Sequence, residues 1–271
     1  MIQILLSTYN GERYLREQID SIIGQTYTDW RLLVRDDGST DGTLALIQEY
    51  MAQDSRIFFL SDEQTHKGAM RSFEYLLTNC PAADYYAFAD QDDVWLSDKL
   101  ERSVEAMHET ERQAGVDKPL LVHTDLLLTD SKGTMIADSF WKYCNIRPIL
   151  LSQRVEYQAI CNCITGSTML FNHAARIISL PFPQGAYMHD ATIGLSVRIY
   201  GLVVSLPVST VRYRQHSGNA LGAVPYRCSL KDIPFKWHLA VLSYRNGYGR
   251  VWHHLLHFVY WKIRYFFALH R

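Results

Sequence analysis

The stretch IQILLSTYN (residues 2–10) decides the fold, because an apolar run ends abruptly in four polar residues. The same change recurs in WRLLVRDDGSTDG (residues 30–42), where an apolar segment leads into acids and glycines. Short apolar runs of this kind are typical of strands that are buried on both faces. Between them, Tyr14, Ile19 and Ile22 follow helical spacing. The alternation predicts parallel strands joined by helices.

The later segments continue this alternation through the first half of the chain. Apolar runs predict further strands at about residues 56–60 and 85–89, and helical spacing predicts helices at about residues 43–51, 69–77 and 99–111. After Pro119 the pattern loosens, and we expect strands at about 120–128, 167–171 and 203–213, a helix at 190–200 and a polar loop region at 130–148. This order indicates an α/β protein, most simply one domain with an appended tail.

The composition excludes several classes of protein. Of the 271 residues, 48% are hydrophobic and 20% are charged, which argues against a disordered or collagen-like chain. The five cysteines form no regular framework, and Cys161-x-Cys163 lacks zinc-ligand spacing, so we expect reduced thiols in a cytoplasmic protein. The apolar start breaks at Ser7, and no uncharged apolar run reaches about 20 residues. We therefore expect neither a signal peptide nor a transmembrane span.

The charge is distributed unevenly along the chain. The formal net charge is −1, yet residues 231–271 hold seven Lys or Arg and a single Asp. Within this tail, residues 250–271 interleave aromatic and basic side chains, as helices that lie in a membrane interface do. A helix packed on the rest of the chain and a dimer contact are equally open alternatives. Nucleic-acid binding is disfavoured, because the acidic body of the protein would repel phosphates.

Three polar clusters follow predicted strands, at residues 7–10, 36–39 and 90–93. Ligands of open parallel sheets bind beyond the carboxyl ends of the strands, so the three clusters are expected to converge there. In Asp90-Gln91-Asp92, two carboxylates two residues apart in an extended segment would face one divalent cation bound to a diphosphate. Each cluster alone could be an ordinary polar loop.

The adjacent acids Asp36 and Asp37 suggest a second kind of contact. Helix capping accounts for Thr40 or Asp41 in this turn, but two neighbouring acids at a strand end need a further explanation. One of them could accept a hydrogen bond from a base N–H or a sugar hydroxyl.

Taken together, these motifs resemble family 2 of the inverting glycosyltransferases, which have the GT-A fold. The resemblance rests on LSTYNGERYL (residues 6–15), QTY (25–27) and DDGSTDGT (36–43), and it extends over about residues 2–219. The segment DQDDVW (90–95) is similar to the metal motif of a rhamnosyltransferase-like branch.

The resemblance implies a role for each motif. Tyr9 would stack on the nucleotide base, within a nucleotide-binding set comprising Ser7, Thr8, Tyr9, Asn10, Asp36, Asp37, Lys67, Arg71 and Asp90. The stretch at residues 66–73 departs from the family's Asn-x-Gly…Asn-Phe pattern, since it has His66 and Ser72 at the two Asn positions. Arg71 would approach a phosphate or lie on a solvated helix face. The metal, Mn²⁺ or Mg²⁺, would be held by Asp90, Asp92 and a late histidine, His216.

Inverting transfer needs one general base to deprotonate the acceptor hydroxyl. The family places this Asp downstream of the metal motif near a helix start, and Met188-His189-Asp190 is similar to that signature. We therefore favour Asp190 as the base over a simple helix cap. Acceptor contacts are assigned to Trp95 and His189.

The sequence thus predicts a GT-A catalytic domain over residues 1–220 and a helical tail over 221–271. The nucleotide-binding half would extend to about residue 115, and the acceptor-binding half from about 116. The expected reaction transfers a sugar, with L-rhamnose suggested, from a dTDP- or UDP-linked donor to a glycan or lipid-linked glycan of a surface polysaccharide. The expected location is cytoplasmic, with peripheral attachment to the inner face of the cell membrane left open.

Two other functions compete with this reading. A sugar-nucleotide pyrophosphorylase would also use an α/β sheet and acidic metal ligands, but residues 6–11 lack its Gly-rich loop with a basic residue. A non-catalytic glycan-binding scaffold with the same fold is the other alternative. The sequence leaves the donor, acceptor, linkage and oligomeric state open.

Overall fold

The computed structural model describes residues 1–62, 66–186, 188–218, 222–223, 233–247 and 249–269. Its strands are β1 (Ile2–Thr8), β2 (Trp30–Asp36), β3 (Ile57–Phe59), β4 (Tyr85–Asp90), β5 (Val94–Trp95), β6 (Leu120–Thr129), β7 (Met135–Ala137), β8 (Met169–Asn172) and β9 (Leu202–Arg214). Its helices are α1 (Glu12–Ile23), α2 (Thr43–Gln53), α3 (Gly68–Asn79), α4 (Lys99–Ala114), α5 (Phe140–Tyr143), α6 (Pro148–Ser152), α7 (Val155–Ile160), the 3₁₀ turn η1 (Gly166–Thr168), α8 (His173–Ser179), α9 (His189–Tyr200), α10 (Ile233–Gly247) and α11 (Leu255–Leu269).

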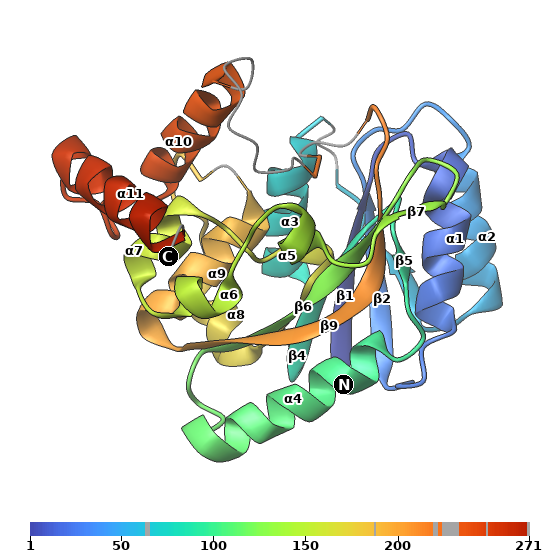
Figure 1. Cartoon of the computed structure of the whole chain (residues 1–271). Helices are drawn as coiled ribbons and strands as arrows, with labels where there is room; N and C mark the ends of the chain where they lie inside the picture. Colours follow the sequence, from blue (N-terminus) through green and yellow to red (C-terminus); the bar gives the residue numbers. More distant parts are fainter. Residues whose placement is uncertain (63–65, 187, 219–221, 224–232, 248, 270–271) are drawn as a thin grey trace.

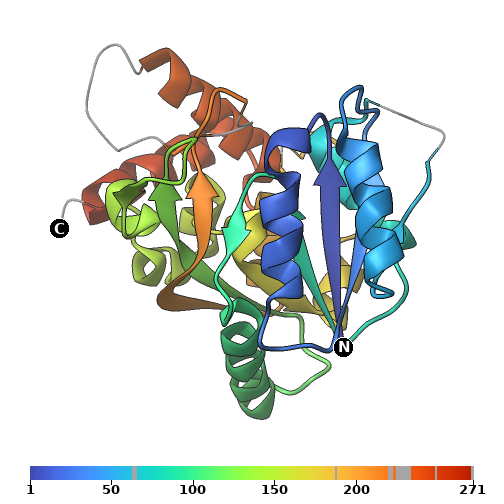
Figure 2. The same ribbon diagram turned by 90° about the vertical axis from the view of Figure 1, so that its right-hand side faces the viewer.

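Within the described residues, nine strands form one twisted sheet (Figures 1 and 2). The order is β3-β2-β1-β4-β8-β6-β9-β5, and β7 pairs with β6 at the side. Strands β3, β2, β1 and β4 are mutually parallel, as the alternation of strands and helices predicted. The second half is mixed, because β8 runs antiparallel to both β4 and β6 while β9 runs parallel to β6.

Helices cover both faces of the sheet, each over its own apolar core. In β1, the side chains of Ile2, Ile4 and Leu6 join the core under α1, α2 and α4, whereas Leu5 joins the core under α3 and α9. These strand residues are fully buried, and burying each such side chain contributes about 1.5–3 kcal/mol. Burial on both faces explains why β1 reads as a continuous apolar run.

The strand register aligns the polar clusters at one edge of the sheet. Ser7 lies opposite Asp90 in the β1–β4 pair, and Thr8 lies opposite Asp36 in the β1–β2 pair. The residues that follow these three strands therefore meet at their common carboxyl ends, as expected for parallel strands.

The region predicted as a polar loop, residues 130–148, contains short elements instead. Strand β7 pairs with β6, and α5 packs against the same strand. The side chain of Ser139 caps α5 by accepting a hydrogen bond from the main chain of Lys142. Elements of three or four residues leave no periodic pattern in a sequence, which is why the apolar spacing missed them.

The prediction of a helical C-terminal tail is confirmed over the described residues. Helices α10 and α11 both pack against α7, and α10 also contacts α9 (Figure 1). In α11, the side chains of Phe258, Trp261, Tyr265 and Leu269 are buried in this packing. Among the described helices, none combines the length and apolarity needed to cross a bilayer.

Candidate active site

A cavity of about 720 Å³ opens at the carboxyl ends of β1, β2 and β4. Four of the residues that line it are acids: Asp37, Asp90, Asp92 and Asp190. Of the other predicted site residues, Ser7, Thr8, Tyr9 and His189 also line it. The convergence that the strand order predicted is therefore present in the structure.

The motif Asp90-Gln91-Asp92 begins at the end of β4 and continues into a turn. The sequence had suggested an extended segment, but Gln91 and Asp92 lie in the turn. Both carboxylates of the motif nevertheless border the cavity. Burial, reinforced by the negative charges of Asp92 and Asp190, raises the pKa of Asp90 to about 7. Asp90 therefore lies close enough to Asp92 and to Asp190 for their negative charges to disfavour its ionised form.

His216 completes this acidic cluster from the far end of the chain. Its Nε2 atom lies 2.6 Å from Oδ2 of Asp92. The two residues meet because β5, which follows Asp92, pairs with β9, which ends just before His216, so that Val94 lies opposite Arg212. Arg214 supports the same turn from outside the cavity, where its Nε donates to the main-chain oxygen of Asp92 at 3.0 Å.

Gln91 is a site residue that the sequence analysis did not single out. Its side-chain oxygen accepts a hydrogen bond from the main-chain N–H of Tyr9 at 2.9 Å, and its amide donates to the Tyr9 carbonyl at 3.0 Å. A Cβ on Gly11 would lie 2.3 Å from the Gln91 side-chain oxygen, so any larger residue at position 11 would require the Gln91 amide to move. Gln91 thereby ties the loop that carries Tyr9 to the acidic motif.

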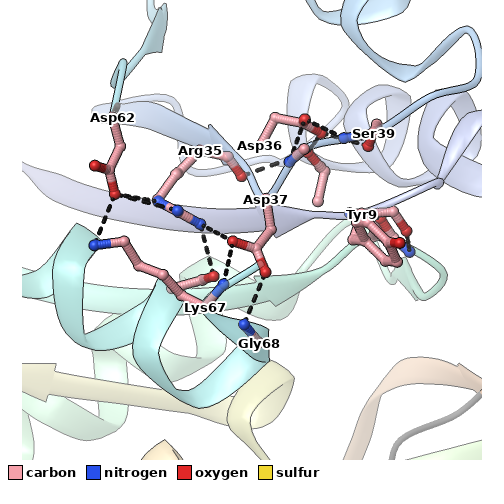
Figure 3. Close-up of polar contacts among 12 residues, drawn as sticks. Tyr9, Arg35, Asp36, Asp37, Ser39, Asp62, Lys67 and Gly68 are labelled. Atoms are coloured by element: carbon pink, nitrogen blue, oxygen red, sulfur yellow. Dashed lines mark hydrogen bonds and ion pairs between the residues drawn. The ribbon is translucent and has the colours of Figure 1, made fainter. Parts of the chain in front are cut away.

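The neighbouring acids Asp36 and Asp37 have different surroundings (Figure 3). Asp36 accepts hydrogen bonds from Thr8, from the hydroxyl and main-chain N–H of Ser39 and from the main chain of Gly38, and it does not line the cavity. These bonds hold the turn after β2. Asp37 does line the cavity, beside the half-exposed ring of Tyr9.

Asp37 is held by the start of α3 and by Arg35. The main-chain N–H groups of Lys67 and Gly68 and the guanidinium of Arg35 all donate to its carboxylate. Burial alone would raise its pKa, but these hydrogen bonds outweigh that effect and lower the pKa below the usual value. Gly68 has φ +75°, a left-handed conformation that favours glycine.

Six of the predicted site residues do not line this cavity: Asp36 and His216, described above, and Asn10, Lys67, Arg71 and Trp95. Asn10 joins two loops by accepting a hydrogen bond from the main chain of Thr40. Lys67 directs its ammonium group to Asp62, 3.0 Å away, and only its main chain supports Asp37. The structure places the side chain of Arg71 in an ion pair with Glu74 on the outer face of α3.

Trp95 is the last of these six residues, and the structure places it in the core and not at an acceptor site. Its side chain is only 3% exposed and packs among the apolar residues beneath α1 and α4. The ammonium of Lys99 lies 3.8 Å from the centre of its ring. Proximity in sequence to the acidic motif did not bring Trp95 to the cavity, because β5 turns its side chain inward.

Asp190 lies in the first turn of α9, beside the η1 turn. Its carboxylate accepts hydrogen bonds from the main-chain N–H groups of Ala191, at 2.5 Å, and Gly166, at 3.2 Å. Burial raises its pKa to about 6 despite these bonds. The N-cap position belongs to Met188, so capping does not account for Asp190.

His189 forms part of the cavity wall next to Asp190. Both of its ring nitrogens lack a hydrogen-bond partner within the described part of the chain, and burial lowers its pKa to about 3. The ring packs on Phe73 and Phe88. A Cβ at Gly166 would lie 2.5 Å from Nε2 of His189, so Gly166 makes room for the imidazole while its N–H holds Asp190.

The charge of the cavity bears on which ligands it can accept. The described residues that line it include no lysine or arginine, and only Asp37 of the four carboxylates is paired with a cation, Arg35, from behind the wall. Likewise, the described chain has no group of three or more His, Cys, Asp or Glu residues placed to hold a metal ion, so the predicted ligands Asp90, Asp92 and His216 do not form one in this arrangement. A diphosphate entering this cavity would need a cation beside it, and the oxygen donors of Asp90 and Asp92 suit Mg²⁺ or Mn²⁺.

The other half of the cavity is largely apolar and comes from the second half of the chain. Ser243 of α10 borders it, so the tail contributes to this wall. The remaining residues of this half include Phe140, Cys144, Ile146, Ile160, Cys161 and Ile164. An acidic half beside an apolar half gives the cavity two chemically distinct regions.

Comparison with known proteins identifies the family. The family model described as glycosyl transferase family 2 matches residues 3–172. The chain belongs to this family. The resemblance seen in the sequence motifs is thereby confirmed.

Curated relatives of the chain are also glycosyltransferases by name. An uncharacterized glycosyltransferase of Haemophilus influenzae is 26% identical over 83% of this chain and 68% of its own length. The UDP-Glc:alpha-D-GlcNAc-diphosphoundecaprenol beta-1,3-glucosyltransferase WfgD of Escherichia coli is 36% identical over 40% of this chain and 41% of its own. The dTDP-rhamnosyl transferase RfbG of Shigella flexneri is 35% identical over 38% of this chain and 36% of its own length. The match thus spans less than half the length of the latter two relatives.

Solved structures share the fold. Residues 1–349 of TarS of S. aureus, in complex with UDP, have a TM-score of 0.60 at 17% identity, covering 89% of this chain and 64% of that fragment. The mannosyltransferase PcManGT of Pyrobaculum calidifontis, in complex with GDP-Man and Mn²⁺, has a TM-score of 0.55 at 16% identity, covering 99% and 73%. The family 2 chain therefore has the GT-A fold that its sequence predicted.

Proposed function

We propose that this family 2 glycosyltransferase transfers a sugar from a nucleotide diphosphate sugar to a hydroxyl group of a glycan acceptor, with inversion at the sugar carbon. The observation that carries the proposal is the placement of Asp190 in one cavity with Asp37, Asp90 and Asp92. One cavity thus holds a candidate base, a cluster suited to a diphosphate-bound cation and a polar group suited to a nucleotide base.

Asp190 acts as the general base in this proposal. Two main-chain N–H groups fix its carboxylate, and a pKa of about 6 leaves it ionised but basic near neutral pH. It takes the proton of the acceptor hydroxyl as that oxygen attacks the sugar and the bond from the sugar carbon to the diphosphate oxygen breaks. His189, the acceptor contact expected from the sequence, forms the cavity wall beside this base.

The other end of the cavity would hold the donor. Tyr9 offers an aromatic face, 48% exposed, for stacking on the base, while Asp37 and Ser7 offer polar contacts. Asp90, Asp92 and His216 would hold Mn²⁺ or Mg²⁺, which, when bound, neutralises negative charge on the departing diphosphate.

Relatives support a choice among donors and acceptors. The names of two of them include UDP-Glc and dTDP-rhamnosyl, and one acts on a diphosphoundecaprenol-linked sugar. We accordingly assign a UDP- or dTDP-linked donor, with L-rhamnose among its candidate sugars, and a glycan or lipid-linked glycan acceptor in surface polysaccharide biosynthesis.

Part of the tail is suited to an anionic membrane surface. On α11, seven exposed apolar side chains fall within a sector of about 140° on the helix; they are Leu255, Leu256, Val259, Tyr260, Ile263, Phe266 and Phe267. Arg264 and Lys262 flank this sector, and residues 233–271 contain no acid. We assign the α11 apolar face to the acyl boundary of an anionic membrane, where lipid-linked acceptors reside.

Replacement of the base tests the central proposal. Purified wild-type protein and the Asp190→Asn variant would be incubated with Mn²⁺ and a panel of UDP- and dTDP-sugars, and the release of nucleoside diphosphate measured. We expect the variant to bind nucleotide with unchanged affinity and to lose at least 100-fold in turnover. Undiminished turnover of the variant would remove Asp190 from the base role. Absence of nucleotide binding by the wild type would contradict the enzyme assignment as a whole.

A further inference from the structure

Arg35, at the end of β2, is fully buried directly behind Asp37 (Figure 3). Its Nη1 atom donates to Oδ1 of Asp37 at 2.9 Å and to the hydroxyl of Ser72 at 2.7 Å. Its Nε and Nη2 atoms each lie 3.2 Å from Oδ2 of Asp62. A guanidinium with contacts on three sides cannot turn away from Asp37, so the position of Arg35 is fixed by the fold.

These contacts determine how many hydrogen bonds Asp37 can still accept. An ionised carboxylate has about four acceptor positions, two on each oxygen. Both positions on Oδ1 are used, one by Arg35 and one by the main-chain N–H of Lys67, which is also 2.9 Å away. On Oδ2, the N–H of Gly68 takes one position at 2.8 Å. One acceptor position therefore remains on Asp37, and it lies on Oδ2.

The number of remaining positions matters for base recognition. Uracil and thymine present one N–H donor, at N3, on their Watson–Crick edge. Guanine presents two parallel donors, N1–H and N2–H, which a carboxylate accepts only with both oxygens. Cytosine has an acceptor at N3, which would face the carboxylate and repel it. A donor left without a partner in a buried contact costs binding free energy.

We propose that Arg35 is a positioning residue that makes Asp37 a single hydrogen-bond acceptor and thereby selects uracil or thymine nucleotides over guanine and cytosine nucleotides. This inference rests on the proposed function, since it requires Asp37 to face the base of a bound donor. It adds a selection mechanism and assigns it to a residue that does not touch the nucleotide.

Asp36 provides an internal comparison within the same turn. All four of its acceptor positions are used by Thr8, Gly38 and Ser39, at distances of 2.6–3.0 Å. Asp36 therefore has no acceptor position left for a ligand, whereas Asp37 has one. The two adjacent acids of the motif differ because only Asp37 faces α3 and Arg35.

The wild-type protein tests the inference without any substitution. Dissociation constants for UDP, GDP and N3-methyl-UDP would be measured by calorimetry in the presence of Mn²⁺. We expect UDP to bind at least tenfold more tightly than GDP or N3-methyl-UDP, because both lose or misplace the single hydrogen bond. Equal affinity for UDP and GDP would overturn the inference while leaving the proposed function intact. Failure of all three to bind would overturn both.

Substitutions then separate selection from structural support. The Arg35→Met variant frees one acceptor position on Oδ1, and Arg35→Leu frees the same position with a shorter apolar side chain in case the first variant does not fold. The control Ser72→Ala removes a partner of Arg35 without changing Asp37. We expect the ratio of the GDP to the UDP dissociation constant to fall at least fivefold in a folded Arg35 variant and to stay unchanged in Ser72→Ala. A folded Arg35 variant that weakens UDP and GDP equally would reduce Arg35 to a structural role and overturn the inference.

Discussion

Asp190 combines two opposing influences on one carboxyl group. Burial raises its pKa to about 6, while hydrogen bonds from the main chain of Ala191 and Gly166 act in the opposite direction. The result is a group with a pKa near the working pH, which is what general base catalysis requires. A helix-capping carboxylate that is exposed to water would not have its pKa raised by burial.

The pKa of Asp190 predicts how activity depends on pH. Only the carboxylate form can take a proton, so turnover at saturating donor and Mn²⁺ should fall about tenfold per pH unit below pH 6 and level off above pH 7. Initial rates measured between pH 5 and pH 8.5 check this expectation. A rate that is constant across this range would contradict it.

Gly166 is expected to be sensitive to the addition of a single methyl group. In Gly166→Ala, the new Cβ would lie 2.5 Å from Nε2 of His189, so the imidazole or the η1 turn must shift. Because the Gly166 N–H also holds Asp190, we expect turnover to fall at least tenfold.

The affinity of Gly166→Ala for UDP is the internal control, since Tyr9 and Asp37 lie on other loops. It should remain within twofold of the wild type. Full activity in this variant would show that the spacing of Gly166 and His189 has no part in catalysis.

At the level of elements, the strand pair β5–β9 has an effect out of proportion to its size. It comprises the pairs Val94↔Arg212 and Trp95↔Val211, yet it brings residues 92 and 216 into contact. Helix α11 has two apolar faces: one packs on α7, and the other remains exposed. Exposed apolar patches of this extent mark interaction surfaces.

Two charges on the α11 apolar face should weaken membrane binding. In the double variant Leu256→Glu and Phe267→Glu, we expect binding to vesicles of phosphatidylglycerol to fall at least tenfold, because both side chains are more than half exposed on that face. Sedimentation with vesicles measures the bound fraction, with phosphatidylcholine vesicles as the test of charge dependence.

The control for this variant is Val116→Glu, which places an acid on an apolar side chain that is 64% exposed elsewhere in the molecule. It should bind vesicles like the wild type. If the wild type ignores vesicles and forms a dimer that the double variant disrupts, as measured by light scattering, the surface is an interface between copies and not a membrane contact.

On the scale of the whole molecule, the buried carboxyl groups of the cavity affect how the stability of the fold depends on pH. Burial raises the pKa of Asp90 to about 7 and that of Asp190 to about 6, both above the ordinary range of a carboxyl group. Their folded-state pKa values exceed the unfolded value of about 3.9, so the folded protein binds more protons than the unfolded one between pH 4 and pH 7. These two groups therefore lower stability as the pH rises through that interval.

Ligand binding should offset this loss. A divalent cation with UDP would compensate the ionised carboxylates, so we expect Mn²⁺ with UDP to raise the Tm more at pH 8 than at pH 5.5. Thermal unfolding with and without ligand at the two pH values measures the difference. Equal shifts in Tm at both pH values would indicate that protons do not compete with the ligand for these carboxylates.

Much of the architecture could be predicted from local patterns. The apolar runs at β1, β2 and β4 specify strands buried on both faces, and their spacing with α1, α2 and α3 requires parallel pairing. Parallel strands end at one edge of a sheet, so the convergence of Tyr9, Asp37 and Asp90 also followed from the sequence. Period and chain order suffice for these features, because they depend on neighbours along the chain.

Only the tertiary structure decided which side chains of each motif reach the cavity. Asp36 and Asp37 are adjacent and chemically identical, but the turn after β2 consumes one and the start of α3 presents the other. Trp95 is buried in the core, and the ammonium group of Lys67 forms an ion pair with Asp62. The physical reason is that hydrogen-bonding capacity and burial depend on partners far away in the chain, such as Arg35 beside Asp37 and His216 beside Asp92, and no local pattern encodes those distances.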